Sequence, residues 1–207
     1  MKTVFGKKVG MTRIFLDDGT AVPVTVIQAG PCPVVQIKTE KNEGYNAIQL
    51  GYEEIRKSLV NMPTKGHFDR VKVTPRKFLR EVRIDSLEGI EVGKEFSVDV
   101  FSVGEKVNVS GISKGLGFMG TVRRHGFKGG PKTHGQSDRW RAPGSIGQCS
   151  YPGRVLKGTR MAGKTGRDMI TVKNLTVMKI DTKNNLICIK GAVPGKNRTF
   201  LRIRKSR

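Results

Sequence analysis

Short runs rich in valine, isoleucine and threonine recur over residues 9–52 and again over residues 170–204. Apolar and polar positions alternate within these runs, and a period of two is typical of strands with one buried face. Turn-forming segments such as Asp17–Thr20 and Lys183–Asn185 separate the runs. The pattern predicts strands over Val9–Phe15, Ala21–Gln28, Pro33–Thr39, Tyr45–Tyr52, Ile170–Ile180, Leu186–Lys190, Gly191–Gly195 and Thr199–Arg204.

Residues 53–77 break this alternation. We interpret them as a small insert with a short helix over Thr64–Arg70, in which Thr64 is the N-cap because its side chain accepts hydrogen bonds from free backbone amides. Short strands on both sides of one long insertion favour a closed β-barrel, completed by the C-terminal strands. The predicted fold is therefore mainly β, with a small α-containing insert and a long irregular basic central loop.

The segment between the two groups of strands has a different composition. Residues 110–167 hold 14 of the 26 glycines, together with Pro131, Pro143 and Pro152. Glycine and proline at this density do not sustain long helices or central strands. A stretch of this length without regular structure is typical of a functional loop or of a segment that becomes ordered on a partner. We expect it to be mobile in the isolated protein.

The distribution of charge indicates that this partner is a polyanion. The 207 residues carry 39 Lys and Arg against 17 Asp and Glu, a formal net charge of +22. Residues 1–109 have 17 basic and 14 acidic side chains, residues 110–167 have 12 against one, and residues 168–207 have 10 against two. Such an excess is normally neutralised by a polyanion, which is nucleic acid, an acidic membrane surface or a sulfated polysaccharide, and nucleic acid is the commonest of the three. This balance disfavours most enzymes that act on small molecules.

Several other classes of protein are disfavoured. No apolar run approaches the roughly 20 residues that span a bilayer, and residues 1–15 lack the apolar region of a secretory signal. Cys32, Cys149 and Cys188 are odd in number and form no C-x-x-C pair, which argues against a disulfide framework and a zinc finger. We expect a cytoplasmic protein that uses no membrane, metal ion or cofactor.

Two glycine motifs match nucleotide-binding patterns. Gly158–Thr165 fits G-x-x-x-x-G-K-[ST], the phosphate loop of nucleotide hydrolases. Gly115–Gly120 fits G-x-G-x-x-G, the dinucleotide fingerprint, with Asp138 near the expected acidic position. Both chemistries need a buried strand before the loop and a helix after it. The glycines and prolines around both motifs disfavour these elements, so a nucleotide-using enzyme is the less favoured alternative.

Four other residues of this segment also suggest chemistry. His125, His134 and Cys149 are a conceivable Cys–His nucleophile or metal site, but their spacing matches no such pattern, so we interpret the histidines as contacts to bases or phosphates. Trp140 has two interpretations of equal weight: it stacks on a base, or it anchors the loop on its own barrel. No catalytic residue is predicted.

Basic residues recur every few positions through the central segment, with almost no acidic residues to pair with them, which is typical of a surface that follows phosphates. No recognition helix, RNP aromatic pair or zinc module is evident, so recognition of a folded RNA by its shape is expected. A polyanion binder without preference among RNAs is the alternative. The candidate RNA-binding residues are Lys114, Arg123, Arg124, His125, Lys128, Lys132, His134, Arg139, Trp140, Arg141, Arg154, Lys157, Arg160, Lys164, Arg167, Arg202, Arg204 and Lys205.

Long motifs give the chain a family resemblance. They are KKVGMTRIF at Lys7–Phe15, SKGLGFMGTVRRHGFKGGPKTHG at Ser113–Gly135, APGSIGQCSYPGRVLKGTRMAG at Ala142–Gly163 and NLICIKGAVPG at Asn185–Gly195. With them, nearly the whole chain resembles bacterial-type large-subunit ribosomal protein three, the L-three family. The resemblance implies a structural protein of the large ribosomal subunit, with a translation-factor-like β-barrel and a central loop that passes through ribosomal RNA toward the peptidyl transferase centre.

The same resemblance implies further expectations. The protein would bind near the 3′ end of the large-subunit ribosomal RNA, nucleate assembly and contact the ribosomal proteins L-fourteen and L-nineteen. Gln148, in the GSIGQ motif, would be the site that a dedicated glutamine methyltransferase converts to N5-methylglutamine. We expect residues 1–113 to form the first part of the barrel, with the insert near 53–77, residues 114–167 to form the RNA-penetrating loop, and residues 168–207 to complete the barrel and provide a basic tail.

Overall fold

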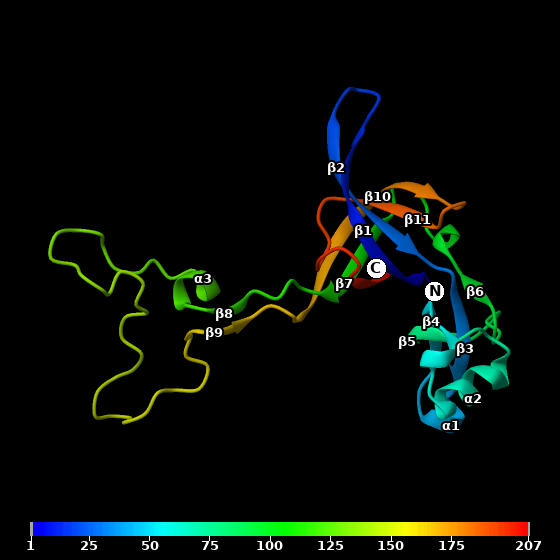
Figure 1. Cartoon of the computed structure of the whole chain (residues 1–207), viewed down its shortest axis with the longest axis horizontal. Helices are drawn as coiled ribbons and strands as arrows, with labels where there is room; N and C mark the ends of the chain where they lie inside the picture. Colours follow the sequence, from blue (N-terminus) through cyan, green and yellow to red (C-terminus); the bar gives the residue numbers. More distant parts are fainter. Residues whose placement is uncertain (1, 207) are drawn as a thin grey trace. The chain divides into compact units, whose positions relative to one another are not determined.

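The computed structural model describes residues 2–206, which form two compact units (Figure 1). The first unit comprises the residues up to Ile112 together with those from Met169 onward, and the second comprises Ser113–Asp168.

The first unit contains most of the regular structure. Its strands are β1 (Thr3–Phe15), β2 (Ala21–Ala29), β3 (Cys32–Lys38), β4 (Ala47–Glu54), β5 (Arg76–Arg83), β6 (Glu95–Phe96), β7 (Lys106–Ile112), β10 (Met169–Asp181), β11 (Leu186–Lys190) and β12 (Phe200–Lys205). Its helices are α1 (Glu40–Glu43), α2 (Met62–Val71) and the 3-10 helices η1 (Lys57–Leu59) and η2 (Val98–Val100). The second unit contains β8 (Gly117–Met119), α3 (Thr121–His125) and β9 (Gly163–Thr165).

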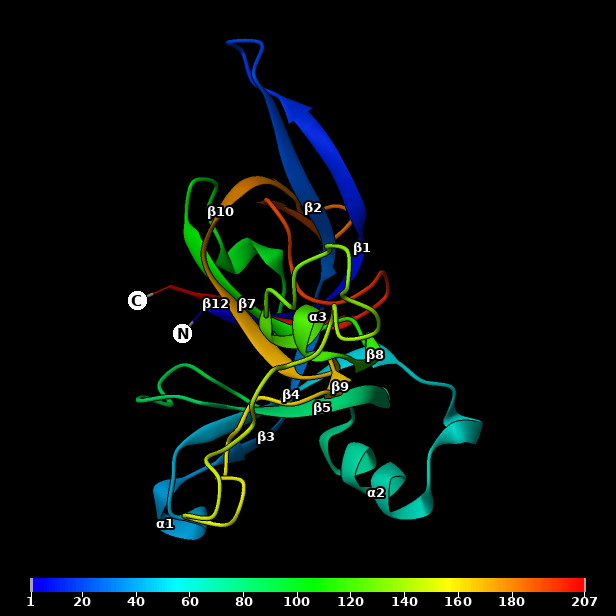
Figure 2. The ribbon, with the colours of Figure 1, turned by 90° about the vertical axis from the view of Figure 1, so that its left-hand side faces the viewer.

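Six strands close into a barrel in the order β1-β12-β7-β10-β11-β2, and each is antiparallel to its neighbours. Five of them, β1, β2, β7, β10 and β12, are labelled in Figure 2. The C-terminal β12 lies between the N-terminal β1 and β7, so the last strand completes a sheet that the first strand begins. The predicted fold class, mainly β with a closed barrel, is confirmed. The pairing of β7 with β10 runs to Ile112 opposite Met169, so the second unit is inserted between two paired barrel strands.

Alternation along the strands builds the barrel core. In β12, Leu201 and Ile203 are fully buried, whereas Arg202 and Arg204 between and after them are exposed. Fully burying an aliphatic side chain of this size contributes roughly 1.5–3 kcal/mol of stability, which makes these positions the main support of the fold. The other fully buried side chains of the barrel strands include Val4, Phe5, Val24, Ile27, Val107, Val109, Val177, Ile187 and Ile189.

Two of the predicted strands do not belong to the barrel. Residues 33–39 and 45–52 correspond to β3 and β4, which form a separate four-stranded sheet in the order β5-β4-β3-β6. This sheet shares the core of the barrel: the ring of Phe78 on β5 stacks on that of Phe200 on β12 with centroids 4.7 Å apart. The Tyr52 hydroxyl on β4 also donates to the carbonyl oxygen of Gln28 on β2 over 2.9 Å. Residues of both sheets pack in one hydrophobic core, so the apolar pattern of a strand does not predict to which of the two sheets it belongs.

The predicted helix in the insert is present as α2, but Thr64 is not its N-cap. Asn61 occupies that position, and its side chain makes no capping hydrogen bond. Pro63 lies in the first turn, where its missing N–H costs nothing because that donor has no partner inside a helix. The proline is thus the signal that places the start of the helix, and Phe68 anchors the helix by full burial.

The predicted strand at Gly191–Gly195 is also wrong. This segment forms bends between β11 and β12, and Gly195 has a φ of +82° that no strand adopts. The buried ammonium group of Lys8 donates to the carbonyl oxygens of Val193 and Gly195 over 3.2 and 3.3 Å. A side chain therefore satisfies carbonyls that a neighbouring strand would otherwise pair.

Candidate nucleic-acid interface

The second unit begins and ends in a short ladder. The backbone amide of Ser113 donates to the carbonyl oxygen of Asp168 over 2.9 Å, and that of Leu116 donates to Thr165 over 3.0 Å. Strands β8 and β9 then pair antiparallel, and α3 follows β8 directly. The sequence predicted an irregular loop, and the structure adds this ordered base of two strands and one five-residue helix.

Two side chains of α3 bind the backbone just before β9. The Arg124 guanidinium donates to the carbonyl oxygen of Met161 over 2.9 Å, and Nε2 of His125 donates to the same oxygen over 3.0 Å. Because a carbonyl only accepts, this contact requires His125 to carry a proton on Nε2. A Cβ atom at Gly163 would collide with the end of the Arg124 side chain, so the guanidinium takes this position because residue 163 is a glycine. Arg124 and His125 therefore hold the loop together, whatever else they contact.

The two glycine motifs pair with each other. Gly117, Phe118 and Met119 of the first motif lie opposite Thr165, Lys164 and Gly163 of the second. Lys164 and Thr165 thus lie in a strand, at the point where a phosphate loop would begin a helix. The first motif itself forms β8 and is followed only by the five-residue α3, and the second motif ends in β9 and is followed by β10. Neither motif therefore leads from a strand through a loop into a long helix, as nucleotide binding needs, and both glycine patterns serve this antiparallel contact instead.

Trp140 holds together residues 130–140, which form the first lobe of the loop. The Trp140 indole donates from Nε1 to the carbonyl oxygen of Gln136 over 3.1 Å, and the Trp140 carbonyl accepts from the amide of Gly130 over 2.8 Å. The Lys132 ammonium lies over the indole ring, 5.8 Å from its centroid. These contacts fall within residues 130–140, so they join Trp140 to its own segment of the loop and not to the barrel. Stacking of the indole on a base stays a prediction.

The candidate modification site lies in a second lobe of the loop, formed by residues 144–155. Gln148 is exposed, and its side-chain amide has no hydrogen bond to another residue of the described chain. The preceding turn is held by the Ser145 hydroxyl, which donates to the carbonyl oxygen of Gly147 over 2.9 Å. Cys149, next to Gln148, is also exposed, and its sulfur lies 3.8 Å from the Ser150 hydroxyl oxygen. Gln148 and Cys149 are thus two neighbouring exposed side chains of the second unit.

The charges of the second unit are not neutralised within it. Residues 113–168 carry twelve Lys and Arg against Asp138 and Asp168. None of the ion pairs found among residues 2–206 includes a side chain of this unit. Every one of the twelve is exposed, as is His134, and His125 is half-buried; the twelve are Lys114, Arg123, Arg124, Lys128, Lys132, Arg139, Arg141, Arg154, Lys157, Arg160, Lys164 and Arg167. A dense set of free cations on a glycine-rich backbone can accept closely spaced phosphates.

One cleft lies within the second unit where its two lobes join. It has a volume of about 660 Å³, and its charged lining residues are Lys128 and Arg139. Gly129, Gly130 and Gly144 form part of its wall. Because these glycines have no side chains, an RNA strand can come close to the protein backbone beside the two cations.

The C-terminal candidates belong to the barrel unit. Arg202 and Arg204 project from the exposed face of β12. Lys205 pairs with Glu105, at 3.0 Å between its Nζ and the nearer carboxylate oxygen, so it is a partly neutralised cation. The candidate residues thus divide into two sets, one in each unit.

Two aromatic residues of the second unit were missed by the sequence analysis. The side chains of Phe118 on β8 and Tyr151 in the second lobe are 80% and 85% exposed, the highest values among the large apolar side chains of residues 2–206. Trp140 is only 42% exposed. A free aromatic face is what stacking on a base requires. The available signal was an aromatic residue inside the glycine-rich basic segment, outside any alternating run.

No helix within residues 2–206 is long and apolar enough to cross a membrane. Over the same residues, no three His, Cys, Asp or Glu side chains gather in a way that would hold a metal ion.

Comparisons with known proteins give a consistent result. A family model described as ribosomal protein L3 matches residues 85–185. The chain is 53% identical over 205 residues to the large ribosomal subunit protein uL3 of Carboxydothermus hydrogenoformans, covering 99% of this chain and 97% of that protein. It is 52% identical over 194 residues to the protein of the same name from Herpetosiphon aurantiacus, covering 93% and 90% of the two chains. The corresponding protein of Bacillus thuringiensis is 48% identical over 200 residues, with coverages of 97% and 94%.

These relatives define the class as structural proteins of the large ribosomal subunit, which are not enzymes and are found in the cytoplasm. Identity near 50% over nearly the whole length, together with the barrel and its basic insertion, places this chain in one family of that class. The chain belongs to the ribosomal protein L3 family.

Proposed function

We propose that this protein binds the large-subunit ribosomal RNA directly near its 3′ end, nucleates assembly of the subunit and extends residues 114–167 toward the peptidyl transferase centre. The observation that carries the proposal is the set of twelve exposed Lys and Arg of residues 113–168, none of which is in an ion pair within the described chain. Such a surface is compatible with close-packed phosphates and with few other ligands. Membership of the ribosomal protein L3 family supports the ribosomal RNA as the source of those phosphates.

In this proposal the two units have different tasks. The first unit, which contains the barrel, positions the protein, while residues 114–167 follow the RNA between its helices. Cations neutralise the phosphates, and the glycines allow backbone contact where RNA helices converge. The binding residues are the candidates named from the sequence, to which we add Phe118 and Tyr151 as faces for unstacked bases.

Two protein contacts and one modification complete the proposal. The neighbours in the subunit are L-fourteen and L-nineteen. A glutamine methyltransferase acts on Gln148, whose exposed amide supports this assignment. Methylation removes one N–H donor and keeps the carbonyl acceptor and the charge, so it changes hydrogen bonding alone. Intact mass and peptide mapping of the protein purified from its own ribosomes measure the expected gain of one methyl group at Gln148.

Direct binding is tested with a 3′-terminal fragment of large-subunit ribosomal RNA and an unrelated folded RNA of equal length. Affinity for both RNAs falls as salt rises, because counterion release drives both. We expect the ribosomal fragment to keep an advantage of about a hundredfold across the salt series, which reports shape-specific recognition. Coinciding curves would mean a general polycation, and the proposal would be wrong.

A further inference from the structure

We propose that an open cleft on the barrel unit binds a phosphodiester of the RNA backbone, at a site whose residues are separate from the loop. The inference rests on the proposed function for the identity of the RNA. The cleft has a volume of about 530 Å³ and is formed by the start of β1, the end of β5 with the residues after it, and the end of β12. Its lining residues are Lys2, Thr3, Arg83, Ile84, Asp85, Ser86, Arg204, Lys205 and Ser206.

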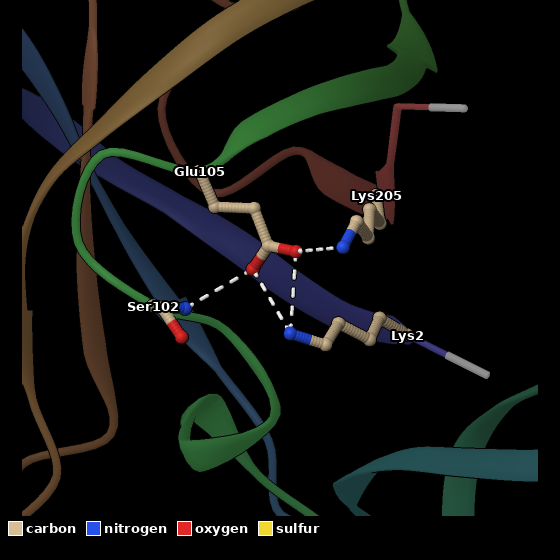
Figure 3. Close-up of polar contacts among 4 residues, drawn as sticks. All are labelled: Lys2, Ser102, Glu105 and Lys205. Atoms are coloured by element: carbon tan, nitrogen blue, oxygen red, sulfur yellow. Dashed lines mark hydrogen bonds and ion pairs between the residues drawn. The ribbon is translucent and has the colours of Figure 1, made fainter.

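Glu105 brings two of the four cations of the cleft together. Nζ of Lys2 donates to both carboxylate oxygens of Glu105 over 3.2 and 3.3 Å, and Nζ of Lys205 lies 3.0 Å from one of them (Figure 3). The backbone amide of Ser102 donates to the other oxygen over 3.1 Å, so the carboxylate itself is held in place. An ammonium group has three N–H donors, and each lysine retains donors for a second anion. Glu105 is thus a positioning residue for two ammonium groups.

Arg83 is positioned by an aromatic ring. Its guanidinium lies over the ring of Tyr45, 5.0 Å from the centroid. The ring is itself fixed, since the Tyr45 hydroxyl donates to Glu81 over 2.8 Å and accepts from Lys38 over 3.2 Å. Arg83 is in none of the ion pairs of residues 2–206, so its N–H groups remain available for an anion, and a guanidinium fork matches the two oxygens of a phosphate.

The charge balance of the cleft favours an anion. Arg83 and Arg204 are exposed, and neither is in an ion pair within residues 2–206. Asp85 lines the cleft and Glu105 binds the two lysines, so the four cations still exceed these two carboxylates. The Ser86 hydroxyl adds a donor to the lining, whereas the Ser206 hydroxyl already donates to the side-chain oxygen of Asn174 over 2.7 Å. Arginine guanidiniums beside lysine ammonium groups are a common donor set for phosphate. In a ribosomal protein, the RNA backbone is the source of such phosphate groups.

The test uses the full-length chain and the 3′-terminal ribosomal RNA fragment. The double variant Arg83→Ala with Arg204→Ala removes the two unpaired guanidiniums. We expect the Kd to rise about tenfold at low salt and the slope of log K against log salt to shrink by about 0.7–0.9 for each phosphate that the protein no longer neutralises. The matched control, Lys65→Ala with Arg70→Ala, removes the same charge from the exposed face of α2 and should change the Kd less than threefold.

Hydroxyl-radical footprinting separates this site from the loop. The cleft variant should lose protection over one short stretch of RNA, whereas a loop variant, Arg139→Ala with Arg141→Ala, should lose protection elsewhere. A separate calorimetric titration of the protein with inorganic phosphate alone tests whether the cleft is instead a site for free phosphate. Binding of that ion by the wild type, with unchanged RNA affinity of the cleft variant, would overturn the RNA assignment.

The remaining outcomes are also decisive. A cleft variant that matches the α2 control refutes the cleft, and the proposed function stands if the loop variant is weakened. If the wild type does not prefer ribosomal RNA at all, both proposals fail together. Arg83→Lys with Arg204→Lys guards against misfolding, since it keeps the charge: we expect its salt slope to stay and its Kd to rise about threefold, because a lysine cannot form the bidentate fork.

Discussion

The carbonyl oxygen of Lys114 lies where a side chain at Gly166 would begin. A Cβ atom on Gly166 would collide with this backbone oxygen, and Gly166 also has a φ of +83°. In Gly166→Ala the left-handed conformation costs roughly 1–2 kcal/mol, and the collision adds to it. We expect the β8–β9 ladder to open, with at least tenfold faster hydrogen exchange of the Leu116 amide, as measured by exchange and mass spectrometry.

Gly158 is the matched control for this variant. Its φ is +84°, but an added Cβ atom would meet nothing within 4 Å. Gly158→Ala therefore carries the backbone strain without the collision, away from the ladder. Exchange of the Leu116 amide should stay at the wild-type rate. Equal exchange rates in the two variants would contradict the steric account.

Glu105 makes stability depend on pH. Burial opposes ionisation of this carboxyl, but hydrogen bonds from Lys205, the Ser102 amide and Lys2 outweigh it and hold its pKa below the ordinary 4.5. Because the folded pKa is lowered, the stabilisation is fully present above pH 4.5 and is lost as the pH falls through the folded value. Glu105→Gln should lower the free energy of unfolding by about 1 kcal/mol at pH 7, since both lysines are partly exposed.

Urea unfolding at a series of pH values checks this prediction. The difference between wild type and Glu105→Gln should shrink below pH 4.5 and vanish well below it. Glu88→Gln is the control, because the exposed side chain of Glu88 is in none of the ion pairs of residues 2–206. A difference that grows as the pH falls would mean that the pKa of Glu105 is raised instead.

Tyr151 should contribute to RNA affinity through its ring. Stacking on one base contributes about 1–3 kcal/mol, so Tyr151→Ala should weaken binding to the ribosomal RNA fragment by about tenfold or more. Tyr151→Phe keeps the ring and should stay within about twofold of the wild type. The salt slope should not change in either variant, because the number of neutralised phosphates stays the same.

Val155→Ala controls for a general effect of truncation in the same lobe, since Val155 is an exposed apolar residue without a ring. Its affinity should equal that of the wild type in a filter-binding assay. If Tyr151→Phe loses as much affinity as Tyr151→Ala, the hydroxyl rather than the ring makes the contact, and stacking is refuted.

The barrel core should depend on Leu201. This side chain is fully buried in β12 and reaches the position that a Cβ atom of Gly111 on β7 would occupy. Leu201→Ala leaves a cavity and should lower the free energy of unfolding by about 2–5 kcal/mol in urea titrations. The exposed Val103 is the control: Val103→Ala should change stability by less than about 0.5 kcal/mol. A small effect of Leu201→Ala would show that the barrel does not depend on this side chain.

The strands of this protein are visible in its apolar pattern, but their partners are not. Neighbouring residues of β3 and β4 are buried together, as Val34 with Val35 and Ala47 with Ile48 show, so both strands are covered on both faces. Each strand is recognised from a short apolar run. Such a run does not show that β4 pairs with β5 in a second sheet, because strand pairing joins residues far apart in the chain. The incorrect strand at Gly191–Gly195 has the same origin, since the buried Lys8 that satisfies its carbonyls lies more than 180 residues away.

The two parts of the candidate interface differ in the same way. The loop was predictable because twelve cations and many glycines follow one another along the chain. The cleft on the barrel was not, because Lys2 and Arg83 come from a region of nearly balanced charge. Only the structure shows that acidic partners such as Glu53 and Glu81 are used by other lysines, while Arg83 stays free of an ion pair within the described residues.

The sequence by itself determined the mainly β class, the position and charge of the basic loop and the family of the protein, because each depends on residues that are neighbours along the chain. The tertiary structure decided which strands leave the barrel, which aromatic rings are free and which cations meet in one cleft. These depend on contacts between distant residues, and pairing, burial and neutralisation of charge are settled only when those residues come together.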